Sequence, residues 1–87
     1  MPISLDKYRA KLVIRILYSL SGQDAVKYIQ RTVLLLKRKN LATDTITSFV
    51  DKIIHQLESI RQSTTDTFKW QHIALVILAL SEIKQQL

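Results

Sequence analysis

Cysteine is absent from this sequence, and glycine and proline occur once each, as Gly22 and Pro2. Without cysteine the chain forms neither disulfides nor thiolate zinc sites, as is common for cytoplasmic proteins. Glycine and proline most often interrupt helices, so their scarcity favours long helices. The longest apolar run, residues 73–80, has eight residues, whereas a membrane span needs about twenty. Residues 1–6 also lack the pattern of a signal peptide. We therefore expect a soluble, cytoplasmic domain over residues 1–87.

Catalytic and cofactor motifs are also missing. The sequence has no glycine-framed serine, no glycine-rich phosphate loop and no acidic pair isolated in an apolar cluster, so we expect neither an enzyme nor a cofactor. The two histidines, His55 and His72, belong to no metal-binding motif. A metal site formed with Asp51 and Glu58 is conceivable if the last two helices are antiparallel, but solvated histidines are the simpler interpretation.

Apolar residues recur at spacings of three and four along four segments, the period of an amphipathic helix. The pattern predicts helices at about residues 4–20, 23–39, 44–62 and 66–86. The expected inner faces are Leu5, Tyr8, Leu12, Ile16 and Leu20; Ala25, Val26, Ile29, Val33 and Leu36; Ile46, Val50, Ile53, Leu57 and Ile60; and Ile73, Val76, Leu80, Ile83 and Leu87.

Polar residues between these segments predict where the helices begin and end. Ser4, then Thr43 or Asp44, are suitable N-caps of the first and third helices, and Asn40 is a suitable stop after the second helix. For the fourth helix several caps are available, Ser63, Thr64, Thr65 and Asp66. Four long helices joined by short loops predict an all-α, antiparallel up-down-up-down four-helix bundle.

Charge is divided unevenly along the chain. Residues 1–42 hold nine Lys or Arg and two acids, a net +7, whereas residues 43–87 hold four bases and five acids, a net −1. At 100° per residue, bases of the first two helices lie opposite the apolar faces, interleaved with apolar side chains. This predicted basic face consists of Lys7, Lys11, Arg15, Lys27, Arg31 and Arg38 with Ile14, Tyr18 and Leu34. It is either an ordinary solvated surface or a docking surface for an anionic partner.

The fourth helix has apolar residues outside its inner face. Leu75 and Leu78 lie off the seam, and Trp70 flanks them. The simpler interpretation is that this helix is buried on several sides. The alternative is that Trp70, Leu75 and Leu78 form a self-association surface, for example of a homodimer.

The basic residues raise a further alternative, nucleic-acid binding. The helices on either side of residues 39–43 are too long for a helix-turn-helix, and the bases lie mostly on the first two helices. Few exposed aromatic residues are left to stack on bases. We therefore expect neither nucleic acid nor a small-molecule substrate as the partner.

Residues 24–30, 34–39, 49–57, 68–71 and 80–83 together carry a resemblance. In helix length, loop position, basic character and apolar pattern they are similar to the enterocin A/pediocin-type bacteriocin immunity proteins. The resemblance covers residues 24 to 85.

This resemblance implies a cytoplasmic four-helix bundle without catalysis or cofactor. Such a protein protects a bacteriocin producer at the inner face of the membrane, on the sugar-phosphotransferase permease that the bacteriocin targets. It also implies that specificity lies in the last two helices. Together with the basic face, it predicts a non-enzymatic protein that docks on a membrane-embedded protein or an anionic membrane surface. The alternative is a small helical adaptor or regulator that self-associates through its fourth helix.

Overall fold

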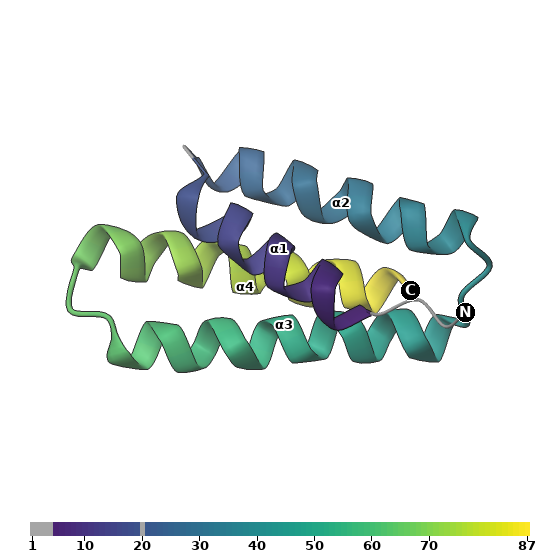
Figure 1. Ribbon diagram of the computed structural model, residues 1–87. Coiled ribbons are helices and arrows are strands. Elements are labelled where there is room, and N and C mark those ends of the chain that lie inside the picture. The colour runs from purple at the N-terminus through teal and green to yellow at the C-terminus, as the bar shows by residue number, and fades with distance from the viewer. Residues whose placement is uncertain (1–4, 20) are drawn as a thin grey trace.

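A computed structural model describes residues 5–19 and 21–87, and within them every regular element is a helix. The four helices are α1 (Leu5–Tyr18), α2 (Gly22–Arg38), α3 (Thr43–Ser63) and α4 (Thr67–Gln86). Successive helices run in opposite directions (Figure 1). The predicted all-α, up-down-up-down four-helix bundle is therefore confirmed, and each described helix boundary lies within two residues of its predicted position.

The helices occupy the corners of a square in which α1 and α4 face each other diagonally, as do α2 and α3 (Figure 1). The surface grooves reflect the same order, since one runs between α1 and α2, one between α1 and α3, and two between α2 and α4. The α2–α3 turn thus crosses the end of the bundle diagonally. Two antiparallel hairpins, α1–α2 and α3–α4, pack against each other in this arrangement.

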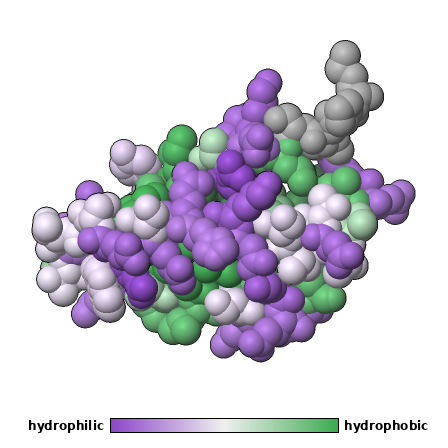
Figure 2. All heavy atoms as spheres, turned by 90° about the horizontal axis from the view of Figure 1, so that it is seen from below, coloured by the Kyte–Doolittle hydropathy of each residue, from purple (hydrophilic) through white to green (hydrophobic). Residues whose placement is uncertain are grey.

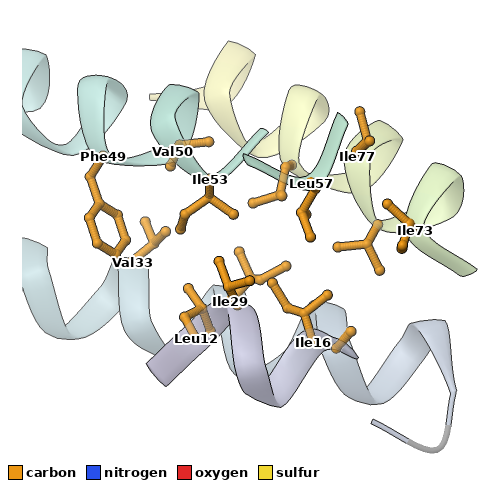
Figure 3. Packing of buried hydrophobic residues seen from close by; sticks show 14 of the residues in the cluster. Leu12, Ile16, Ile29, Val33, Phe49, Val50, Ile53, Leu57, Ile73 and Ile77 are labelled. Atoms are coloured by element: carbon orange, nitrogen blue, oxygen red, sulfur yellow. The ribbon is translucent and has the colours of Figure 1, made fainter. Parts of the chain in front are cut away.

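Sixteen apolar side chains from all four helices form one buried core, and no polar side chain of the described residues is buried with them. Side chains of α1 and α2 meet those of α3 and α4 between the two hairpins (Figure 3). The period of three and four residues locates most of this core, because one face of each helix turns inward. The face that α3 shows from below is largely hydrophilic, with apolar side chains visible between polar ones (Figure 2).

The observed inner faces differ from the prediction in all four helices. In α3 and at the end of α4, three predicted inner residues are only partly buried, namely Ile60, Ile83 and Leu87, and Ile77 of α4 is buried in addition. The differences in α1 are similar. Val13 is buried there, whereas Leu5 and Tyr8 pack only at the edge of the core. In α2, Val26 was also predicted to face inward and is half-buried. A helix that touches two neighbours buries a stripe set by both, which the sequence of one helix does not specify. Of the other predictions, the N-cap at Ser4 and the inner position of Leu20 lie outside the described residues.

The turn after α2 is built around Asn40, which has a left-handed φ of 61°. The Asn40 amide donates to the carbonyl of Lys37, at 3.0 Å, and the Leu41 amide donates to that of Leu36, at 3.4 Å. These two bonds form a Schellman motif, which places Leu41 against the core. The predicted stop at Asn40 is thereby confirmed.

The predicted cap of α3 is wrong. Its N-cap is Ala42, which makes no side-chain capping bond, and Thr43 is already the first helical residue. The preceding turn fixes this start, because Leu41 packs against the core and the chain enters the helix directly after it. Asp44 lies in the first turn, where a carboxylate interacts favourably with the helix dipole.

The N-caps of α2 and α4 are formed by side-chain oxygens. The Ser21 hydroxyl accepts a bond from the Asp24 amide at the start of α2. An Asp66 oxygen accepts bonds from the amides of Phe68 and Lys69, so Asp66 is the one of the four candidate residues that caps α4.

Candidate docking surface

All six predicted basic-face cations are exposed on α1 and α2. Over residues 5–19 and 21–87, two ion pairs form, Arg9 with Asp6 and Lys84 with Asp51. Neither pair involves a residue of the basic face. Carboxylates of α3 and α4 therefore do not neutralise these cations, and their field extends into solvent.

Part of the basic face is gathered into a groove between α1 and α2. The groove has a volume of about 570 Å³ and is lined by Arg15, Lys27 and Arg31 together with Tyr18 and one carboxylate, Asp24. Residues on two different helices thus place three cations around one hollow. We call this hollow the basic groove.

One of these cations is held in place by an aromatic ring. The guanidinium carbon of Arg15 lies 4.9 Å from the ring centroid of Tyr28, across the α1–α2 interface. A cation over an aromatic face is attracted to it, and the contact restricts the rotamers of Arg15. The sequence did not predict a role for Tyr28 beside the basic face, because this role depends on a residue of the neighbouring helix.

The same interface holds a second cation over a ring. The ammonium of Lys39 donates a hydrogen bond of 3.1 Å to the Tyr8 hydroxyl, and it lies 5.4 Å from that ring's centroid. Lys39 is the C-cap residue of α2, and Tyr8 lies near the start of α1. Both are therefore at the end of the bundle opposite the basic groove. Neither this contact nor that of Arg15 with Tyr28 was predicted from the sequence, which indicated instead that Tyr8 faces the core.

The remaining basic-face residues are exposed but lie outside the basic groove. Ile14 is 56% exposed on α1, and Lys7 and Lys11 lie on the same helix. Leu34 borders a separate groove between α2 and α4. Arg38 is the last residue of α2, at the opposite end of the bundle. The basic face is therefore a broad surface with one concave part.

The expectation that α4 is buried on several sides is wrong for two of its residues. Leu75 is 61% and Leu78 64% exposed, and Trp70 is 45% exposed. Leu75 borders an apolar groove with Val26 of α2. Because α4 contacts its neighbours along one stripe, its opposite face is open to solvent.

The histidines behave differently from each other. His55 is exposed, as expected. The expectation that His72 is solvated is wrong, since it is half-buried and its Nε2 lies 2.8 Å from the Ile16 carbonyl oxygen and 3.1 Å from Ser19 Oγ. A carbonyl only accepts, so Nε2 carries the proton. In the described part of the chain no three metal-ligating side chains come together.

Comparison with known proteins adds no relative: no protein-family model, curated protein or solved structure matches the chain. Over residues 5–19 and 21–87, no helix has both the length and the apolar character needed to cross a bilayer.

Proposed function

We propose that this protein is a non-enzymatic, bacteriocin-immunity-like protein that docks through its basic face on a membrane-proximal partner in the cytoplasm. The partner is either a membrane-embedded protein or the anionic membrane surface itself. The observation that carries the proposal is the set of exposed cations on α1 and α2 that pair with no carboxylate of the described residues. Three of these cations surround the basic groove. The sequence resemblance to immunity proteins supports the same function.

Physical magnitudes make such docking feasible. Each Lys or Arg near an anionic membrane surface contributes about 1 kcal/mol of attraction. Three cations in the basic groove give an attraction large enough to hold the protein at a membrane in low salt. Exposed Ile14 and Leu34 add apolar contact area beside the charges.

Binding to membranes tests the electrostatic part of the proposal. We expect the protein to co-sediment with vesicles of phosphatidylglycerol, or with membranes from a bacteriocin-sensitive strain, and to be released as salt rises. Lys27→Glu combined with Arg31→Glu should lower the partition coefficient at least about thirtyfold, the equivalent of about 2 kcal/mol for two cations.

A matched control separates the basic groove from net charge. Lys37→Glu combined with Lys52→Glu changes the charge equally at two exposed positions outside the basic face, and its effect should be clearly smaller. Equal losses in both double variants would show that overall charge, and not the basic face, drives binding. Absence of binding even at low salt would refute docking on membranes.

A survival assay tests the immunity part. Expression of the chain in a strain sensitive to a pediocin-like bacteriocin should raise the inhibitory concentration, and the Lys27→Glu/Arg31→Glu variant should protect less. Unchanged sensitivity with confirmed expression of folded protein would contradict immunity towards that bacteriocin.

The second candidate function is a self-associating adaptor, favoured by the exposure of Leu75 and Leu78 on α4. Light scattering after size-exclusion chromatography distinguishes it. A dimer that Leu75→Glu and Leu78→Glu convert into folded monomers would support the adaptor. A monomeric wild-type protein would remove this candidate.

A further inference from the structure

The three exposed aromatic side chains among the chain's six aromatic residues lie at one end of the bundle. Tyr18, the last residue of α1, is 83% exposed; Phe68 and Trp70, in the first turn of α4, are 84% and 45% exposed. α1 and α3 end there, and α2 and α4 begin there (Figure 1). We call this part of the molecule the aromatic end.

A groove of about 490 Å³ connects two of these aromatic residues. Tyr18 and Phe68 both line it, and its floor includes Leu17, Ile60 and Ile73. The groove thus joins residues of α1, α3 and α4. Phe68 and Tyr18 contribute little to the core, so their solvent exposure is not explained by folding of the bundle.

Cations surround the aromatic end. Lys69 lines the groove that joins Tyr18 and Phe68, and none of the described residues that line this groove is a carboxylate. Tyr18 also lines the basic groove, so Arg15, Lys27 and Arg31 are directly adjacent. Of the acids, Asp24 lines the basic groove and Asp66 caps α4. Bases therefore outnumber acids around these rings.

This combination has a specific physical meaning. Aromatic side chains partition to the headgroup level of a bilayer, where an apolar ring and a polar edge are both accommodated. Neighbouring Lys and Arg are attracted to anionic phospholipid headgroups. A second copy of the chain fits less well, because end-to-end contact would bring these cations against their own copies.

We propose that the aromatic end contacts an anionic phospholipid surface, with Tyr18, Phe68 and Trp70 at the headgroup level and Lys69 and the basic groove facing lipid phosphates. The inference rests on the proposed docking function and adds an orientation to it. In this orientation the aromatic end faces the membrane, and the opposite end, where α2 passes into α3, points away from it. Docking with the long axes of α1 and α2 flat on the bilayer is the competing geometry.

The single tryptophan provides the probe, because Trp70 is the only one in the sequence. On vesicles of phosphatidylglycerol and phosphatidylcholine, Trp70 emission should shift to shorter wavelengths and be quenched by brominated acyl chains. Vesicles of phosphatidylcholine alone should give neither effect. These readouts report the surroundings of the aromatic end itself.

Substitutions test the same contact without changing charge. Tyr18→Ser combined with Phe68→Ser should lower the partition coefficient about tenfold or more, because buried apolar area sets interfacial binding. Leu35→Ser removes an exposed apolar side chain of α2 that belongs to none of these surfaces and should leave binding unchanged. Both variants change exposed positions, and circular dichroism would confirm that they fold.

The outcomes separate this inference from the proposed function. Salt-sensitive vesicle binding with unchanged Trp70 emission and full binding of the Tyr18→Ser/Phe68→Ser variant would overturn the aromatic end and leave the basic face standing. Binding to bacterial membranes but not to lipid vesicles would overturn lipid contact and leave docking on a membrane protein. Absence of binding to both would overturn both proposals.

Discussion

The α1–α2 hairpin and the α3–α4 hairpin contribute comparably to the core but present different surfaces. α1 and α2 supply three and four buried side chains, and α3 and α4 supply five and four. The net charge is +7 over residues 1–42 and −1 over residues 43–87. Since packing makes similar demands on both hairpins, it does not account for this charge difference. The cations of the first hairpin are therefore the feature to which we assign a function.

Among the described residues, the polar contacts within the two hairpins, taken together, outnumber those between the hairpins. Arg15–Tyr28 and Lys39–Tyr8 join α1 to α2, while Lys84–Asp51 and Arg61–Trp70 join α3 to α4. Among the described residues, His72 makes the side-chain hydrogen bonds that cross from one hairpin to the other. Apolar burial thus provides nearly all the attraction between the hairpins.

The largest effect should come from the shared core. Ile53→Ala in α3 and Ile16→Ala in α1 each remove a fully buried side chain, and each should lower the free energy of unfolding by about 2–5 kcal/mol. Urea denaturation followed by circular dichroism would measure this. Both variants should show one transition if the hairpins fold as one unit. Two separate transitions would show that the hairpins are independent.

The next effect concerns the polar link between the hairpins. His72→Ala removes one hydrogen bond to the Ile16 carbonyl, which keeps Ser19 Oγ as a donor. We expect a loss of about 0.5–1.5 kcal/mol for this bond, in addition to the lost packing of the half-buried ring. His55→Ala, at an exposed position, is the matched control and should have little effect. A loss no larger than that of the control would show that the link contributes nothing to stability.

Helix caps should have a smaller effect in both hairpins. Asp66→Ala and Ser21→Ala each remove a side chain that accepts a bond from the backbone at a helix start, at a cost of about 1 kcal/mol. Thr65→Ala, at an exposed loop position, serves as the control. Midpoints of thermal unfolding equal to that of the control would contradict the capping role.

The smallest effect should come from the ion pair within the second hairpin. Lys84 Nζ lies 2.6 Å from Asp51 Oδ1, but both side chains are more than a third exposed. Lys84→Met should therefore change the free energy of unfolding by about 0–1 kcal/mol. A much larger loss in a denaturation experiment would indicate that charge pairing, and not only apolar packing, stabilises the α3–α4 hairpin.

The sequence by itself determined the number of helices, most of their inner faces, the stop at Asn40 and the four-residue segment, 63–66, that holds the cap of α4. These features depend on residues a few positions apart, through the helical period and local hydrogen bonds. It also determined the charge difference between the two halves of the chain. The N-cap of α3 at Ala42 was not predicted, and the open face of α4 was only the less favoured interpretation, because both depend on what the neighbouring segments contact.

Only the tertiary structure decided which helices are neighbours. The contact of Arg15 with Tyr28, the bond of His72 to Ile16 and the groove that Tyr18 and Phe68 both line each involve residues of different helices. Amphipathic helices of similar length can pack in more than one order around a core, because apolar burial has no directional preference. The sequence pattern therefore identified the exposed cations, and the packing order determined which of them share a groove and which aromatic residues lie beside it.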